Sequence, residues 1–452
     1  MPVSPSRAAA FDILLRVERE NSYASELLHS AAYEKLSRSD HALATELVMG
    51  VLRWRSGLDD EIAAAASPPR KKLDLEIVIA LRLAVYQFRF LDRIPRRAAL
   101  HESVELVKRA RKRSAASFVN AVLRKLSAST PLDSPVRAGV QSFSWQRIAK
   151  LFAHPPWLVE RWTNDYGEAA SEMICRYNQS TPQTTVRLRD LKSASELGAD
   201  GISLAPGALL SSARHLECGD ITRAKAFRQR QIVIQDEASQ LVAALVGRAE
   251  NRGARILDCC AAPGGKTLAI SDNNPWAAVT AAEIHFHRAR LLQKLLDTRQ
   301  NSQIKAIVAD ARTLPIAQPF DRILADVPCS GTGTLARNPE IKWRLQPGDL
   351  AELQDRQLAI LRSGLAHLAP GGRLVYSTCS LEREENENVI EQALAEVTSI
   401  RLLDCRAELD RLKASGDLIW PTPESLTRGP YLRTIPGVHP CDGFFAAIVE
   451  RF

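Results

Sequence analysis

The chain has 452 residues, of which 45% are hydrophobic and 25% charged, a composition typical of soluble globular proteins. Because a single hydrophobic core rarely extends beyond about 250–300 residues, two or three domains are expected. The sequence has no run of about 18 apolar residues, and its N-terminus lacks the apolar stretch of a signal peptide. Neither a membrane span nor secretion is therefore predicted.

The eight cysteines form no C-x-x-C pair and no cluster with histidine. A zinc site is therefore not predicted, and no metal is expected. Because a disulfide framework is unusual in a chain of this length, the cysteines favour a reducing compartment, and a cytoplasmic protein is expected.

The net charge of +8 is concentrated in one segment. Between Arg89 and Lys125 there are eleven Lys or Arg residues against three acidic residues, so this segment alone carries a charge equal to that of the whole chain. A concentrated basic face is typical of proteins that bind a polyanion such as nucleic acid. A solvated helix face explains the same charges equally well, and the charge pattern alone leaves both interpretations open.

The first 140 residues are predicted to be helical. Apolar residues recur at helical spacing, as in Ala9, Ile13, Leu14 and Val17, and no alternating strand pattern interrupts them. A helical bundle over residues 1–140 is the simplest interpretation. The polar stretch Thr130–Ser142 contains two prolines and is predicted to be a linker.

A small mixed α/β region is predicted to follow, so that residues 141–228 comprise the linker and this region. Helices are predicted over 157–162 and 169–175, and short strands over 184–188 and 202–204.

The remaining part, residues 229–452, alternates strands and helices. Strands are predicted over 255–258, 279–283, 306–310, 322–326 and 373–377, and helices over 289–296 and 350–368. This order is typical of a parallel sheet covered on both faces. Because ligands bind at the carboxyl ends of such strands, the polar motifs that follow the strands are the candidate site.

The first such motif, Asp258–Thr267, contains two glycines that allow close approach of a ligand to the backbone and to the next helix. A Walker A loop would need glycine five positions before Gly265, where the chain has Cys260, and the G-x-G-x-x-G pattern of dinucleotide sites is also absent. The motif therefore indicates a turn that binds a ligand other than ATP or NAD. A purely structural glycine turn is the alternative.

Two acidic residues end the next two predicted strands. Glu283 is placed to hold the ribose hydroxyls of a nucleoside, and Asp310 is placed to reach an adenine edge. An acid at such a position is more often a helix cap. Because the two acids occur in this order on successive strands, they nevertheless predict a site that binds adenosine.

Two further loops each place a cysteine just beyond a strand. One is Asp326–Gly333, which contains Cys329, and the other is Tyr376–Ser380, which contains Cys379. Structural cysteines usually lie in apolar runs, whereas these two lie among Ser, Thr, Pro and Gly. Both are therefore candidate reactive residues.

These motifs resemble those of the RNA cytosine-C5 methyltransferases of the NOL1/NOP2/Sun family, in particular their bacterial 16S ribosomal RNA group (Sun/Fmu). The resemblance extends over nearly the whole chain. Besides the loops above, it includes Gln235–Ser239, Asp442–Phe445 and, in the helical part, Phe118–Arg124. It implies a NusB-like helical RNA-binding domain, an RRM-like middle domain and a Rossmann-like methyltransferase domain that uses S-adenosylmethionine.

The resemblance also implies a role for individual residues. Those expected to contact the cofactor or to lie beside it are Cys260, Ala261, Ala262, Pro263, Gly264, Gly265, Lys266, Glu283, Asp310 and Asp326. The family often has Asp where this chain has Glu283, which affects only the detailed geometry with which the ribose is held. The neighbouring Cys259 is expected to be a packing residue.

For catalysis, the resemblance implies that Cys379 is the nucleophile and that Cys329 assists release of the product. Asp326 is expected to hold the polar edge of the base, with Lys266 assisting. A thiolate added to carbon 6 of cytosine makes carbon 5 able to accept a methyl group, which is covalent catalysis.

The implied partner is small-subunit ribosomal RNA, and a monomer is expected. A transfer RNA or 23S ribosomal RNA cytosine-C5 methyltransferase shares the catalytic motifs, and only the helical domain favours the small subunit. A DNA cytosine methyltransferase would use the Pro-Cys loop for its nucleophile and would not need the Thr378-Cys379 pair. A non-catalytic NusB-like RNA-binding factor is the alternative from a different class, but it would not need two loop cysteines and a complete cofactor loop.

Overall fold

A computed structural model describes residues 3–66, 73–128, 144–189, 197–198, 201–297 and 303–452. The chain forms two compact units. The first unit comprises Met1–Thr181 and Leu335–Arg344, and the second comprises Pro182–Thr334 and Leu345–Phe452. The linker predicted over Thr130–Ser142 lies outside the described residues.

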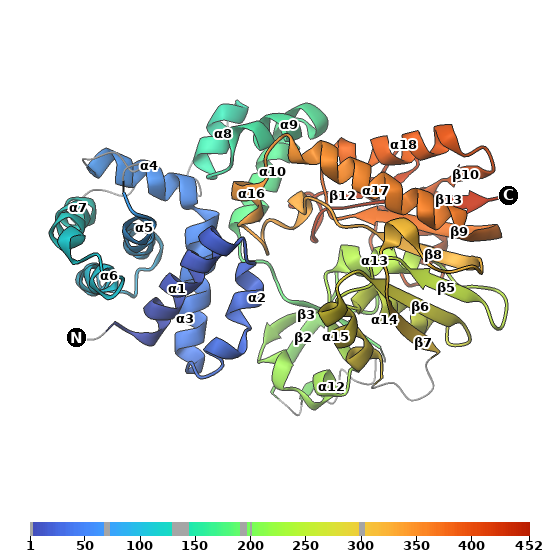
Figure 1. Ribbon diagram of the computed structural model, residues 1–452, viewed down its shortest axis with the longest axis horizontal. Coiled ribbons are helices and arrows are strands. Elements are labelled where there is room, and N and C mark those ends of the chain that lie inside the picture. The colour runs from blue at the N-terminus through green and yellow to red at the C-terminus, as the bar shows by residue number, and fades with distance from the viewer. Residues whose placement is uncertain (1–2, 67–72, 129–143, 190–196, 199–200, 298–302) are drawn as a thin grey trace. The chain divides into compact units, whose positions relative to one another are not determined.

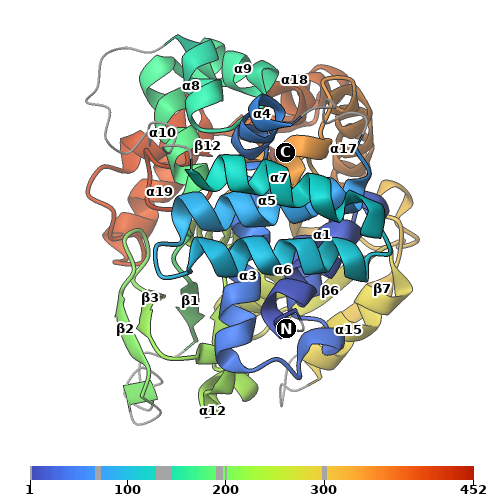
Figure 2. The same ribbon diagram turned by 90° about the vertical axis from the view of Figure 1, so that its left-hand side faces the viewer.

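The described residues of the first unit contain helices and no strand, as predicted for the N-terminal part of the chain. The α-helices are α1 (Pro5–Glu20), α2 (Ala24–Leu28), α3 (Arg38–Arg53), α4 (Arg55–Ala65), α5 (Leu75–Phe90), α6 (Arg96–Arg109), α7 (Ala116–Ala128), α8 (Trp145–Leu151), α9 (Pro156–Tyr166), α10 (Glu168–Gln179) and α16 (Ile341–Arg344). Helices α5, α6 and α7 lie side by side (Figure 2). Every residue of α5 from Ile77 to Phe88 is buried, which is typical of a helix at the centre of a bundle.

The second unit begins with a small antiparallel sheet in the order β2-β3-β1-β4. Its elements are β1 (Thr185–Leu188), β2 (Ser203–Pro206), β3 (Ala213–Cys218), α12 (Lys225–Arg228) and β4 (Ile232–Ile234). The two strands predicted here correspond to β1 and β2. The prediction missed β3 because its side chains do not alternate between buried and exposed, and it missed β4 because that strand is only three residues long.

The larger sheet of this unit contains the five predicted strands as parallel neighbours in the order β7-β6-β5-β8-β9 (Figure 1). Their bounds are β5 (Arg255–Asp258), β6 (Ala278–Glu283), β7 (Ile304–Val308), β8 (Phe320–Asp326) and β9 (Leu368–Thr378). Four further strands extend the sheet beyond β9 with antiparallel pairing: β10 (Ile400–Leu403), β11 (Thr427–Arg428), β12 (Tyr431–Thr434) and β13 (Phe444–Arg451). The sheet is therefore mixed: the predicted parallel strands are present, and the antiparallel extension beyond β9 was not predicted.

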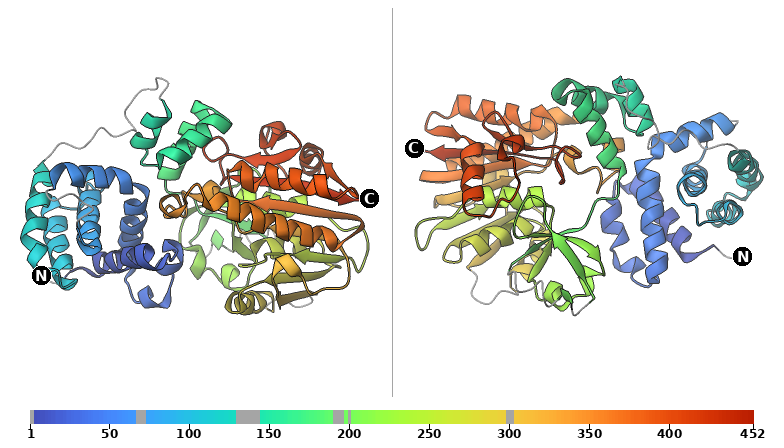
Figure 3. Two further views of the ribbon diagram at one scale, coloured as in Figure 1. Left: turned by 45° about the horizontal axis from the view of Figure 1, so that its top comes forward. Right: turned by 180° about the vertical axis from the view of Figure 1, so that it is seen from behind.

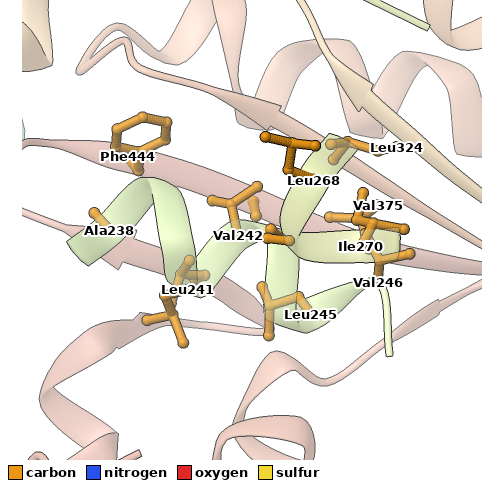
Figure 4. Packing of buried hydrophobic residues seen from close by; sticks show 14 of the residues in the cluster. Ala238, Leu241, Val242, Leu245, Val246, Leu268, Ile270, Leu324, Val375 and Phe444 are labelled. Atoms are coloured by element: carbon orange, nitrogen blue, oxygen red, sulfur yellow. The ribbon is translucent and has the colours of Figure 1, made fainter. Parts of the chain in front are cut away.

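Helices cover both faces of this sheet because side chains alternate along each strand. Val375 of β9 packs in the core that also contains residues of the helices α13, α14, α15 and α19, whereas Leu374 and Tyr376 pack in the core that contains residues of α17 and α18. The helices are α13 (Glu237–Leu245), α14 (Gly265–Asn273), α15 (Phe286–Leu296), α17 (Asp349–Ala366), α18 (Glu387–Glu396) and α19 (Cys405–Ala414). Figure 4 shows the first core, and Figure 3 shows α17 and α18 in orange along the sheet.

A search of the described residues finds no helix with the length and apolar character needed to cross a bilayer. Within the same ranges, no group of three or more His, Cys, Asp or Glu side chains is arranged to hold a metal ion.

Candidate active site

The loops singled out in the sequence follow adjacent parallel strands. The strands β6, β5, β8 and β9 are consecutive neighbours in the sheet. Their carboxyl ends therefore meet at one edge, where Glu283, Asp258, Asp326 and Thr378 are the last residues of the respective strands. The cofactor loop and both cysteine loops leave the sheet at this edge.

The cofactor loop connects β5 with the N-terminus of α14. Gly264 has φ +111°, and a Cβ atom there would lie 2.7 Å from Leu295 and 2.8 Å from Leu292. Glycine is therefore required by both the backbone conformation and the packing of α15. The Ala261 N–H donates to the Ala282 carbonyl at 2.9 Å, which ties the loop to β6. The first turn of α14 has backbone N–H groups without intrahelical partners, as a ligand turn needs.

A buried acceptor lies beside this loop. Asp258 is 1% exposed, and its Oδ2 accepts a hydrogen bond from the Thr267 hydroxyl at 2.7 Å. Its Oδ1 has no hydrogen-bond partner among the described residues. Because buried acceptors are normally paired, this oxygen fits a ligand with an N–H donor, such as the ammonium group of S-adenosylmethionine.

The ionisation of Asp258 provides a prediction for the cofactor-free protein. Burial raises the pKa of Asp258 to about 6, although the Thr267 hydrogen bond lowers it. The folded state therefore binds more protons at this residue than the unfolded state between about pH 4 and pH 6. We expect stability to be lost as pH rises through this window, by about 3 kcal/mol from this residue alone.

The measurement compares wild type with Asp258→Asn, whose amide oxygen can still accept from Thr267. The free energy of unfolding of both proteins is measured with urea at several pH values. As pH rises, the value for wild type should fall relative to the value for the variant. A difference that is constant between pH 4 and pH 7 would contradict this assignment.

Glu283 and Asp310 have different surroundings. Glu283 is 6% exposed, and its Oε1 accepts from the His285 N–H at 2.9 Å. The prediction that a strand ends at Asp310 is wrong, because β7 ends at Val308 and Asp310 caps the next turn through the Arg312 N–H. Arg312 also pairs with the Asp310 carboxylate at 2.6 Å, and this hydrogen bond lowers the pKa of Asp310. A contact of Asp310 with adenine stays a prediction.

Lys266 and Asp326 form an ion pair. The Lys266 ammonium donates to Asp326 Oδ2 at 2.8 Å, and the Ser377 hydroxyl donates to Oδ1 at 2.7 Å. The ammonium also lies 5.0 Å from the centre of the Phe444 ring. Burial opposes the charge on Lys266, but Asp326, with smaller contributions from Cys379 and Asp258, outweighs it, so that the pKa of the ammonium is raised above its ordinary value. The pair therefore offers a fixed carboxylate and a fixed cation side by side.

The two loop cysteines are brought together. The sulfur atoms of Cys329 and Cys379 are 3.3 Å apart, and both residues are free thiols of intermediate exposure. The hydrogen bond to Cys379 and then burial raise the pKa of Cys329 well above its ordinary value. Cys329 is therefore a thiol that can donate towards Cys379.

A close backbone approach fixes the two cysteine loops. The Gly333 N–H donates to the Cys379 carbonyl at 2.9 Å, and the Gly443 N–H donates to the Gly333 carbonyl at 2.8 Å. A Cβ atom on Gly333 would lie 2.2 Å from the Gly443 carbonyl oxygen, so no side chain fits at this position. A Cβ atom on Gly443 would in turn lie 2.9 Å from the Gly333 Cα atom, which explains the glycine of the near-terminal motif Asp442–Phe445.

Glu385 is a site residue that the sequence analysis missed. It is fully buried and accepts from the Ser330 N–H and the Gln357 side chain, both at 2.8 Å. The hydroxyls of Ser330 and Ser380 also donate to it. One carboxylate thus holds the residues that follow both cysteines. In the sequence it lies in the charged run Glu382–Glu385, which is typical of a solvated surface, so no pattern indicated its burial.

The basic segment Arg89–Lys125 is partly neutralised within the first unit. Ion pairs join Arg89 to Glu61, Lys108 to Glu105, Arg109 to Asp12 and Lys112 to Asp74. These four charges therefore have structural partners within the first unit.

Three family models match the chain. The model described as 16S rRNA methyltransferase RsmB/F matches residues 245–450, the NusB family model matches residues 4–128, and an RsmF/B-like ferredoxin-like domain model matches residues 154–217.

Similar proteins cover the chain from end to end. A protein of Bacillus subtilis (strain 168) named probable ribosomal RNA small subunit methyltransferase B is 34% identical, with 98% of each chain covered. The ribosomal RNA small subunit methyltransferase B of Vibrio cholerae is 31% identical over 98% of this chain and 97% of its own. The crystal structure of PH0851 has the same fold, with a TM-score of 0.81, 22% identity and full coverage of both chains.

These matches decide between the classes left open by the sequence. A non-catalytic RNA-binding factor is not supported, because the matches extend through the catalytic part, and the residues of the cofactor loop fit the donor that this family uses. The chain therefore belongs to the 16S rRNA methyltransferase RsmB/F family and is an RNA methyltransferase that uses S-adenosylmethionine.

Proposed function

We propose that the protein methylates carbon 5 of a cytosine in 16S ribosomal RNA through a covalent bond between Cys379 and carbon 6 of the base. The observation that carries the proposal is the 3.3 Å separation of the Cys379 and Cys329 sulfurs beside the Lys266–Asp326 pair. A nucleophile, a second thiol, a carboxylate and a cation at one sheet edge are the groups that this chemistry needs.

The first step joins the Cys379 thiolate to carbon 6. A bond forms between sulfur and carbon 6, and the electron pair of the carbon 5–carbon 6 double bond becomes available at carbon 5. Asp326 accepts a hydrogen bond from the amino group of the base, and Lys266 holds the Asp326 carboxylate in place. These contacts orient the base and stabilise charge that develops on the ring.

The bound cofactor supplies an electrophilic methyl group, which carbon 5 accepts with its electron pair. The proton of carbon 5 then passes to water, the carbon 5–carbon 6 double bond forms again, and the bond between carbon 6 and sulfur breaks. The Cys329 thiol, held as a thiol by its raised pKa, donates towards the departing Cys379 sulfur and assists release.

The residues proposed to hold the cofactor are those of the loop and the two acids named above. The N-terminal backbone of α14 and the residues Cys260–Lys266 surround it, Asp258 accepts from its ammonium group, and Glu283 holds its ribose. Asp310 is expected to lie at the adenine edge.

The target cytosine must leave its stack to reach Cys379, which favours unpaired RNA as substrate. We further propose that residues 1–140 form a NusB-like RNA-binding domain, 141–228 a linker and small α/β domain, and 229–452 the methyltransferase domain. The family models over 4–128, 154–217 and 245–450 support this division. We expect the protein to act as a monomer.

The experiment incubates the protein with labelled S-adenosylmethionine and unmodified transcripts of 16S ribosomal RNA, 23S ribosomal RNA and a transfer RNA pool. We expect 5-methylcytosine in the small-subunit transcript at a single position, detected by nucleoside analysis and bisulfite sequencing. Label that appears only in transfer RNA or 23S RNA would replace the substrate assignment with one of those alternatives. Label at another base or another atom of cytosine would overturn the proposed reaction.

A further inference from the structure

A cavity in the first unit lies outside the methyl-transfer site. Its volume is about 500 Å³, and its lining comes from α1, the connection between α1 and α2, α3, α4 and the segment Leu335–Arg344. This volume lies in the range of small-ligand sites. The cavity is lined by two aromatic rings, two arginines and two carboxylates, Glu18 and Glu340, none of which the methyl-transfer mechanism uses; Glu18 pairs with Arg55 at 3.1 Å.

The guanidinium group of an arginine lies over each aromatic ring of the cavity. Arg344 lies 5.8 Å from the centre of the Tyr23 ring, and Arg55 lies 5.6 Å from the centre of the Trp343 ring. Arg344 is held by the carbonyls of Val17 and Ser22 at 2.8 and 2.6 Å, so its plane is fixed. Aromatic rings and fixed guanidinium planes are the surfaces on which unpaired RNA bases stack.

The buried carboxylate belongs to Glu340. This residue is 1% exposed, and its Oε1 accepts from the Ala24 N–H at 2.8 Å. Its Oε2 is buried and has no hydrogen-bond partner among the described residues. Because buried acceptors are normally satisfied, this oxygen indicates a ligand with an N–H donor. Every RNA base carries such a donor on its pairing edge.

We propose that this cavity binds an unpaired base of the substrate RNA, stacked on the accessible face of one of these aromatic or guanidinium planes and hydrogen-bonded to Glu340. The proposal rests on the proposed function in that it takes the RNA substrate as its ligand. Tyr23 is 44% exposed, so one ring remains accessible to an incoming base. Trp343 belongs to the segment Leu335–Arg344, which follows the Cys329 loop directly in the sequence. A base bound in the cavity would therefore contact a segment that is continuous with that loop.

The test measures binding of the 16S transcript and of a single-stranded oligoribonucleotide to wild type, Tyr23→Ala and Glu340→Gln by fluorescence anisotropy. We expect both variants to raise the Kd for single-stranded RNA, and Tyr23→Ala to do so about tenfold. The same oligonucleotide as a duplex should bind wild type and variants equally, because its bases are not available. The ratio of the Kd values should persist at raised salt, since stacking is less screened than phosphate contacts.

Trp276→Ala is the matched control. Trp276 is 64% exposed, and the guanidinium carbon of Arg252 lies 5.1 Å from the centre of its ring. Unlike Tyr23, it belongs to the second unit and does not line this cavity. Its replacement should leave RNA affinity unchanged. S-adenosylmethionine affinity and the melting temperature report whether each variant is folded, and Tyr23→Phe should bind like wild type because it keeps the ring.

The outcomes separate this proposal from the proposed function. If wild type methylates the transcript and Tyr23→Ala binds single-stranded RNA as tightly as wild type, the base site is wrong and the proposed function stands. If the variant weakens duplex and single-stranded binding alike, the cavity binds phosphates rather than a base, which also overturns the proposal. If wild type methylates no transcript, the proposed function fails, whereas the binding comparison still tests the cavity.

Discussion

Replacement of Cys379 by alanine is expected to reduce methyl transfer by about 10⁴-fold or more, because the variant lacks the atom that activates carbon 5. RNA binding and cofactor binding should change little, since the thiol contributes no charge-charge contact to the phosphate backbone. The measurement is the single-turnover rate of methyl transfer at saturating RNA, together with the Kd for RNA. The loss should appear in the rate and not in the Kd.

A cysteine outside the site provides the control. Cys218 is an exposed free thiol in β3, and Cys218→Ala should methylate like wild type. If Cys379→Ala keeps more than about a hundredth of the wild-type rate, the nucleophile is another residue, since loss of a covalent nucleophile costs far more than that. Cys329 would then be the first candidate, because its sulfur is 3.3 Å away.

Cys329→Ala should have the opposite effect on the covalent complex. The nucleophile is still present, so the bond to carbon 6 forms and one methyl group is transferred. Release then lacks the thiol that donates towards the departing sulfur. We expect a covalent protein–RNA complex to accumulate, visible as a retarded band on a denaturing gel, with about one methyl group transferred per enzyme followed by turnover reduced by about 10²–10⁴-fold.

The double variant distinguishes this expectation from non-specific crosslinking. Cys379→Ala combined with Cys329→Ala should give no retarded band, because the complex requires the nucleophile. Two results would remove Cys329 from the release step: normal turnover by the single variant, or a band that persists in the double variant. A band in wild type that disappears on chasing with unlabelled cofactor would show that the complex is an intermediate.

The sequence alone predicted the features that are local in the chain. Helical spacing over the first 140 residues predicted a helical part, because periodicity is set within a few turns. The five parallel strands were predicted from apolar runs that alternate with helices, and the cofactor loop and the loops of Cys329 and Cys379 were predicted from motifs of fewer than eleven residues. The antiparallel strand β13 was missed because it is buried through most of its length and shows no alternation.

Only the tertiary structure decided which of these residues meet. Lys266 and Asp326 are 60 positions apart in the chain, and Cys329 and Cys379 are 50 apart. The buried Glu385 lies in a charged run that resembles solvated surface, and the cavity of Glu340 forms only where its segment packs among the N-terminal helices. Residue type and spacing determine what chemistry a side chain can perform. Burial and long-range packing determine which side chains face each other and how strongly their pKa values shift, and these depend on contacts between segments that no local pattern records.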